Sequence, residues 1–196
     1  MDEPWTDIEL IERAIGGDRG ALDALWRGVR RWVGAIVLAH KPRESDLEDL
    51  MQQVALTMCA RIGEVRDPEG FKAWLRRVAI NTARAEGRKT TRRRAGFLRF
   101  MGAAPDRGDE ADGHLSDRAR AVLEASRGIP EKYREPVMLR CVHGMSHRQI
   151  GAVMGLPETT VETRIARGRR MLRGAIERMD TADAAPEPAG AAGGAR

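Results

Sequence analysis

Apolar side chains recur every three or four residues through most of this chain, the spacing that places them along one face of an α-helix. Short segments that hold Gly, Pro or small polar residues separate these stripes. Aromatic residues make up only 4% of the chain, and Ala, Leu, Arg and Glu dominate, which favours helix over sheet. The sequence therefore predicts an all-α protein. The apolar stripes of the first part of the chain lie within residues 8–15, 22–37, 47–62 and 71–79.

Three segments of the first part have the composition of helix starts. Thr6-Asp7-Ile8-Glu9 and Ser45-Asp46-Leu47-Glu48 match the capping box, in which two side chains satisfy free backbone N–H groups. Asp67 before Pro68 predicts a further start, because Asp suits the N-cap and Pro the first helical position. We therefore expect a four-helix N-terminal domain over residues 1–94.

The composition changes after this domain. Residues 95–116 hold several Gly residues, Pro105 and an acidic run, and they predict a flexible linker. A short apolar cluster within it, Phe97–Met101, could dock on a domain or on a partner. A second small helical domain is predicted over residues 117–179, and an Ala-, Pro- and Gly-rich tail over 180–196 is predicted to be disordered.

Charge and cysteine content restrict the class of protein only weakly. The net charge of +5 and the pI of about 9.8 give a modest bias toward a polyanionic partner. Cys59 and Cys141 lie in apolar helical contexts, which predicts buried thiols in a reducing cytoplasm. The acidic N-terminus is unlike a signal peptide, and the longest apolar stretch, Val33–Ala39, is far short of the roughly 20 residues of a membrane span. We expect a cytoplasmic protein that does not insert into membranes.

The segment 147–166 carries the most specific local pattern. Ser146 and the Gln three residues later suit the start of a short helix, and Gly155 suits the left-handed position that ends it. Pro157 then opens a second helix, and the small Ala152 is expected to let the two helices cross closely. This pattern predicts a helix-turn-helix.

The second helix of this motif exposes groups that can reach base edges and phosphates in a DNA major groove. The alternative is an ordinary helical hairpin whose basic face is simply solvated. The polar groups expected on that face are Thr160, Thr163, Arg164, Arg167, Arg169 and Arg170.

The sequence around this motif resembles region 4 of extracytoplasmic-function (ECF) sigma factors, whose pattern is close to LPxxYRExxxLRxxxGxSxxEIAxxLGxxxGTVxSRxxRAxxxLR. The matching stretches are Ile129-Pro130-Glu131-Lys132-Tyr133-Arg134-Glu135, then Gly144-Met145-Ser146, and Thr160 through Arg173. In that family the second helix reads the promoter −35 element. The resemblance therefore implies −35 contacts from Thr160, Glu162, Thr163, Arg164, Ala166 and Arg167.

Glu162 departs from this family pattern, which commonly has a basic residue there. A carboxylate repels phosphate but can accept a hydrogen bond from a cytosine amino group. Alternatively, Glu162 closes a capping box with Thr159 and touches no DNA. The sequence leaves both interpretations open.

An independent resemblance lies in the first domain. Residues 45–54 are similar to the family's DAEDLxQExF stretch in region 2, which docks on the coiled coil of the largest polymerase subunit. The alternative is a solvated polar face with carboxylates favoured in a first helical turn. Gln53 stands where the family usually has Glu. The residues implied in polymerase binding are Asp46, Asp49, Leu50, Gln52 and Gln53.

Residues 71–81 and the basic residues after them resemble regions 2.3 and 2.4, which recognise the promoter −10 element in this family. The preceding loop, 64–70, takes up a flipped base there, which costs a few kcal/mol of unstacking that a pocket must offset. Trp74 has the spacing of a core residue more than of a stacking platform, and Arg92–Arg94 suits either phosphate contact or simple solvation. The implied −10 residues are Arg66, Asp67, Lys72, Trp74, Arg76, Arg77, Asn81, Arg84 and Arg88.

Together the resemblances imply a sigma factor, a non-catalytic specificity subunit that binds core RNA polymerase through its coiled coil and flap and recognises promoter DNA. Family members usually have an anti-sigma partner, and the resemblance implies no cofactor. One rival is a two-domain transcription regulator of another class, which has no reason to carry the polar helix at 46–53. Another is a metal enzyme using Cys141, His143 and His147, but the sequence offers no evident fourth ligand and no catalytic arrangement.

Overall fold

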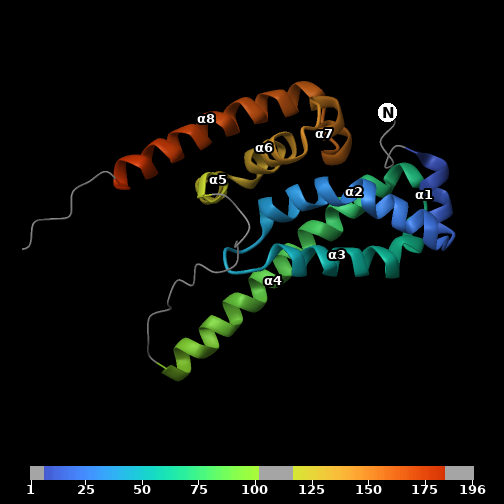
Figure 1. Cartoon of the computed structure of the whole chain (residues 1–196), viewed down its shortest axis with the longest axis horizontal. Helices are drawn as coiled ribbons and strands as arrows, with labels where there is room; N and C mark the ends of the chain where they lie inside the picture. Colours follow the sequence, from blue (N-terminus) through green and yellow to red (C-terminus); the bar gives the residue numbers. More distant parts are fainter. Residues whose placement is uncertain (1–6, 102–116, 184–196) are drawn as a thin grey trace, which may run out of the picture.

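The computed structural model describes residues 7–101 and 117–183, and these residues form helices and turns with no strand (Figure 1). The all-α prediction is confirmed. Two 3₁₀ turns, Ile62–Glu64 and Pro68–Gly70, connect α3 to α4. The α-helices are α1 (Ile8–Ile15), α2 (Arg19–His40), α3 (Leu47–Arg61), α4 (Phe71–Met101), α5 (Asp117–Arg127), α6 (Glu131–His143), α7 (His147–Met154) and α8 (Glu158–Asp183).

Aspartate side chains begin the helices of the first part. Asp7 accepts from the backbone N–H of Leu10, and Asp46 accepts from those of Glu48 and Asp49. The N-cap of α1 and of α3 is therefore this Asp, one residue later than the expected capping boxes place it. Asp67 caps the 3₁₀ turn at Pro68–Gly70, so the long helix begins at Phe71 and not at Pro68.

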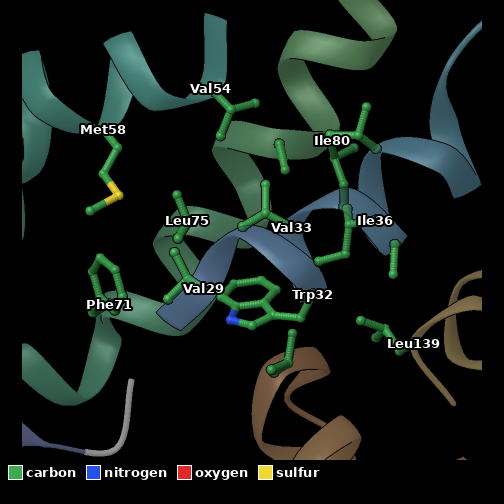
Figure 2. Packing of buried hydrophobic residues seen from close by; sticks show 14 of the residues in the cluster. Val29, Trp32, Val33, Ile36, Val54, Met58, Phe71, Leu75, Ile80 and Leu139 are labelled. Carbon is green, nitrogen blue, oxygen red and sulfur yellow. The ribbon is translucent and has the colours of Figure 1, made fainter. Parts of the chain in front are cut away.

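Helix α2 is the centre of the N-terminal unit, which we define as α1 to α4. It packs against α1, α3 and α4. Trp32 is fully buried, and Figure 2 shows its ring among Val29, Val33 and residues of α4 such as Leu75. Burying one large apolar side chain stabilises a fold by about 1.5–3 kcal/mol, so the buried residues of α2 contribute substantially to the stability of the unit.

The C-terminal unit, α5 to α8, contains the expected helix-turn-helix. Ser146 and Gln149 form a capping box at the start of α7, and Gly155 ends α7 in the left-handed conformation, with φ of 66°. Ala152 is exposed, however, so the prediction that it lets the helices cross closely is wrong. Gly151 makes that close approach, because a Cβ there would lie 2.7 Å from the backbone oxygen of Leu156.

The two units pack directly against each other. Helix α6 lies along α2, and α7 contacts α4. Leu139 of α6 is completely buried, and it belongs to the same apolar cluster as Trp32 and Leu75 (Figure 2). In this conformation the described helices therefore share one continuous core.

The chain between the units differs in part from the expected linker. Helix α4 continues to Met101, so residues 95–101 are helical. Residues 102–116 and 184–196 lie outside the described part of the chain, as do the side chains of the Arg92–Arg94 run and of the Phe97–Met101 cluster.

Both cysteines are exposed, so the prediction of buried thiols is wrong. Cys59 follows the buried Met58 and falls outside the buried stripe of α3. Cys141 is one turn beyond the buried Val137, but it lies near the end of α6, where the core no longer covers that side. Among the described helices, none combines the length and the apolar character needed to cross a membrane.

Candidate nucleic-acid interface

Helix α4 presents a cationic face opposite its buried one. Phe71, Leu75 and Ala79 are buried in the core. The residues that alternate with them at helical spacing point away from it, because a straight helix with one buried stripe must expose the other side. This outer face contains Ala73, Arg77, Asn81, Arg84 and Arg88, all exposed. It brings together four of the residues that the sequence assigns to −10 recognition.

Two predicted −10 residues contact the C-terminal unit. Arg76 binds both carboxylate oxygens of Glu135, with Nε–Oε1 of 2.5 Å and Nη2–Oε2 of 2.8 Å. Arg84 donates to Glu131 of the same helix, α6. These guanidinium groups are thus engaged within the protein, which the sequence did not predict.

The remaining −10 candidates lie at the N-terminal end of α4. Arg66 and Asp67 are exposed, and Asp67 accepts from the backbone N–H of Glu69. Lys72 is half-buried. Trp74 is also half-buried and packs on the core, with its ring centroid 6.1 Å from that of Phe71. The core interpretation of Trp74 therefore has direct support.

Helix α3 carries a separate polar face. Asp46, Asp49, Gln52 and Gln53 are exposed. Leu50 is only 1% exposed, so its assignment to polymerase binding is wrong: it lies on the core side of the helix beside Val54.

Sequence reasoning missed Leu56, which lies on this polar face. It follows Gln52 and Gln53 by one helical turn and is 64% exposed. A single exposed leucine is common on protein surfaces, so Leu56 counts here only because it lies among residues that the resemblance assigns to polymerase binding. The signal was available, because Leu56 falls outside the apolar stripe of α3.

The second helix of the helix-turn-helix is the start of α8. Val161 and Ile165 are buried and fix its rotation, leaving Glu162, Thr163, Ala166 and Arg167 exposed. Thr160 and Arg164 are half-buried at the edges of this face. The predicted −35 residues therefore lie on or beside one surface.

Two contacts bear on individual residues of this surface. The first turn of α8 is closed by the carbonyl of Pro157, which accepts from Thr160 and Val161. Thr159 thus lies inside the helix and not at its N-cap, which removes the capping-box interpretation of Glu162. Arg167 hydrogen-bonds the Tyr133 oxygen, and this bond together with nearby Lys132 keeps the pKa of Tyr133 below its usual range.

The rival metal site is not assembled. Over residues 7–101 and 117–183, no three His, Cys, Asp or Glu side chains converge in a way that could hold a metal ion. Cys141 and His143 lie at the end of α6, and His147 lies beyond the turn at Gly144, at the start of α7.

Two protein-family models match this chain, one in each unit. Residues 25–93, which span most of α2, all of α3 and the basic part of α4, match Sigma-70 region 2. Residues 119–172, which include the helix-turn-helix, match Sigma-70, region 4. The chain belongs to the extracytoplasmic-function (ECF) subfamily of sigma-70 factors. As a sigma factor, it directs promoter-specific initiation of transcription.

Individual relatives of this sigma factor align over nearly their whole length. The ECF RNA polymerase sigma-E factor of Escherichia coli (strain K12) is 28% identical over 187 residues, which is 90% of this chain and 97% of the relative. The ECF RNA polymerase sigma-E factor of Haemophilus influenzae is 28% identical over 198 residues, covering 90% and 98%. The resemblance inferred from short motifs thus extends across both units.

Two solved structures share the fold of this sigma factor. CnrH, in complex with the cytosolic domain of CnrY, superimposes with a TM-score of 0.56 at 24% identity and covers 88% of this chain and 97% of that one. The sigma factor RpoE, in complex with the anti-sigma factor NepR from Bartonella quintana, gives 0.50 at 19% identity and covers 78% and 94%.

Proposed function

We propose that the two units of this sigma factor divide the work of initiation. The N-terminal unit binds core RNA polymerase and opens the −10 element, and the C-terminal unit holds the −35 element. The observation that carries this division is the existence of three separate polar surfaces, on α3, α4 and the start of α8, each made of residues that the family patterns pick out. Tethering both units to polymerase raises their effective concentration at the promoter, so neither needs high DNA affinity alone.

The polar face of α3 is proposed to dock on the coiled coil of the largest polymerase subunit. Asp49, Gln52 and Gln53 supply carboxylate and amide groups in one line, and Leu56 supplies an apolar anchor beside them. A desolvated apolar anchor surrounded by polar contacts is typical of binding hot spots. Asp46 contributes less, because its carboxylate already caps α3.

The outer face of α4 is proposed to hold the non-template strand of the −10 element. Arg77 and Arg88 provide charge for phosphates, and Asn81 between them can hydrogen-bond a base or a phosphate. The loop that contains Arg66 and Asp67 lies at the start of this helix, where it can take up an extruded base. Arg84 lies on this outer face but is paired with Glu131, and Arg76 is paired with Glu135, so both guanidinium groups must leave these carboxylates before they can bind phosphate oxygens.

The exposed start of α8 is proposed to enter the major groove at the −35 element. Thr163 and Arg167 are the groups best placed to reach base edges. The hydroxyl of Thr163 donates to the backbone oxygen of Thr159, which leaves its methyl group and its oxygen lone pairs for DNA. Glu162 is exposed on the same face and can accept from a cytosine amino group.

We further infer that the chain acts without catalysis of its own, in the cytoplasm, and that it contacts the flap of polymerase through its C-terminal unit. An anti-sigma partner is also proposed, because the solved RpoE structure of the same fold was determined with one, NepR. These points rest on family membership and on the shared fold.

Binding to core polymerase tests the docking surface. The double variant Asp49→Ala, Gln53→Ala should lose about tenfold in affinity, about 1.4 kcal/mol, in a fluorescence titration with core enzyme. Glu12→Ala, on the exposed side of α1, is the matched control and should bind as the unmodified chain does. Equal affinity of all three proteins would show that α3 is not the docking surface.

A further inference from the structure

A carboxylate of the C-terminal unit is buried against the N-terminal unit. The side chain of Glu135, on α6, is only 3% exposed. It accepts from His40 Nε2 of α2 at 3.0 Å and from Arg76 of α4 at 2.5 and 2.8 Å. A buried charge is tolerated only when it is paired and hydrogen-bonded, so the carboxylate is held where both partners can reach it. Glu135 thus ties α6 to two helices of the other unit.

Further ion pairs around Glu135 also join a basic side chain of the N-terminal unit to a carboxylate of the C-terminal unit. Glu131 pairs with Arg84 at 2.5 Å, and its other oxygen lies 3.5 Å from His40 Nδ1. At the edge of the interface, Arg43 pairs with Glu124 of α5 at 3.2 Å. In each pair the N-terminal unit supplies the nitrogen and the C-terminal unit the carboxylate.

Apolar side chains close the same interface. Leu139, one turn after Glu135, is fully buried, and Met138 and Met145 are 4% and 1% exposed. All three belong to the core cluster that contains Trp32. These apolar side chains exclude water from the interface, and the ion pairs inside are stronger as a result, because charges interact more strongly at a low dielectric constant.

This interface engages two cations that the proposed function gives to DNA. Arg76 and Arg84 belong to the predicted −10 set, and in this conformation carboxylate oxygens occupy the guanidinium groups that would otherwise bind phosphate oxygens. Arginine binds both kinds of oxyanion through the same planar fork of donors, so one occupant excludes the other.

We propose that the contact of α6 with α2 and α4 is a closed, autoinhibited state of the free sigma factor, in which Glu135 and Glu131 occupy the −10 cations and Glu135 holds the two units together. The inhibitory part of this proposal rests on the proposed function of α4. Opening releases Arg76 and Arg84 for the −10 element and frees the second unit, whose −35 surface is already exposed, to move independently of the first. The pairing also explains why α6 carries a carboxylate at a fully buried position.

Distance measurement tests the closed state without any assay of transcription. Cys59 on α3 and Cys141 on α6 are exposed, one in each unit, and take spin labels without a new substitution. Double electron–electron resonance on the full chain should give one narrow distance distribution for the unmodified protein. Glu135→Gln keeps the side-chain shape and removes the charge, and it should broaden the distribution and add longer distances.

Two further variants keep this test decisive. The Glu131 side chain is about half exposed, so Glu131→Gln should leave folding intact. This variant should open the protein less than Glu135→Gln does. Glu177→Gln, exposed on α8 away from the interface, is the matched control and should change nothing. Circular dichroism verifies that each variant retains its helix content. An unchanged narrow distribution in folded Glu135→Gln and Glu131→Gln would overturn the closed-state proposal.

Binding of a short, fluorescently labelled single-stranded DNA of random sequence tests the inhibition. Freeing one or two cations should raise the affinity of Glu135→Gln roughly threefold to tenfold over the unmodified chain, with a steeper salt dependence. Opening without any gain in DNA affinity would overturn the inhibitory role. Failure of the unmodified chain to direct initiation with core enzyme is a separate result, which would count against the proposed function and leave the closed state standing.

Discussion

Gly168 of α8 lies directly against Val137 of α6: a Cβ built on the glycine would be 2.6 Å from Val137 Cγ2 and 2.9 Å from the backbone oxygen of Tyr133. The two helices therefore cross at a distance that no side chain at residue 168 permits. This crossing fixes the angle at which the recognition surface of α8 leaves the C-terminal unit.

Gly168→Ala should accordingly destabilise the protein by up to about 2 kcal/mol, because overpacking costs about 1–3 kcal/mol and the better helix propensity of Ala offsets roughly 1 kcal/mol of that cost. Gly174→Ala, on the same helix, is the control: its added methyl meets only the end of a flexible arginine at 3.5 Å. Urea unfolding should show the first variant weakened and the second equal to or more stable than the unmodified chain. Equal stability of the two variants would mean that the crossing is looser than described.

Substitutions of Leu50 and Leu56 in α3 should have different effects, one on stability and the other on polymerase binding. Leu50→Ala removes a side chain that is 1% exposed and should cost about 2–5 kcal/mol of unfolding free energy. Leu56→Ala changes a side chain that is 64% exposed, so its stability should stay within about 0.5 kcal/mol. Its affinity for core polymerase should nevertheless fall severalfold. Unimpaired binding of Leu56→Ala would remove this leucine from the proposed docking surface.

Arg167→Ala should weaken upstream recognition. Loss of one good base contact costs about 1–3 kcal/mol, so initiation from a −35-dependent promoter should fall about tenfold or more. A template with a pre-melted −10 bubble should be used almost normally. Arg178→Ala, exposed near the end of the same helix, is the control for lost charge. An equal loss for both variants would point to general electrostatics and not to groove recognition.

The contact between the units should weaken in acid. Burial alone would raise the pKa of Glu135, but the hydrogen bonds from His40 and Arg76 outweigh burial and hold that pKa below its ordinary value of 4.5. A carboxyl group whose pKa is lowered in the folded state contributes stability that is complete above the ordinary pKa and is lost as pH falls through the lowered one.

Spin-label distances followed from pH 7 downward should therefore stay narrow until pH falls below the ordinary carboxyl range, and then lengthen. Glu131 faces the same histidine. Burial alone would raise the pKa of Glu131, but Arg84 and His40 outweigh burial and hold that pKa below the ordinary value, so both acids act in the same direction. Glu135→Gln should be open already at neutral pH and show a much flatter response. Opening of the unmodified chain on raising the pH instead would contradict this linkage.

The local features of the fold were readable from the sequence because they depend on neighbours in the chain. The helix-turn-helix follows from Ser146, Gly155 and the apolar residues between them, all within one short segment. The cationic face of α4 follows from helical periodicity alone. The surface positions of Asp49 and Gln53 follow in the same way.

The features that escaped prediction depend on contacts between distant parts of the chain. Glu135 lies 59 residues from Arg76 and 95 from His40, and nothing in the local pattern around it distinguishes a buried carboxylate from a solvated one. The exposure of Cys141 escaped prediction for the same reason, because it depends on where α6 leaves the core that the two units share. Leu50 was assigned to a binding surface by family pattern although its periodicity placed it in the core.

Run-off transcription with core RNA polymerase on a library of randomised promoters tests the central claim most directly. The account predicts that the purified chain directs initiation from a subset of templates that share two spaced elements, and that Arg167→Ala loses the upstream element from the selected sequences. Failure to enrich any start site, by a chain that does bind the core enzyme, would contradict it.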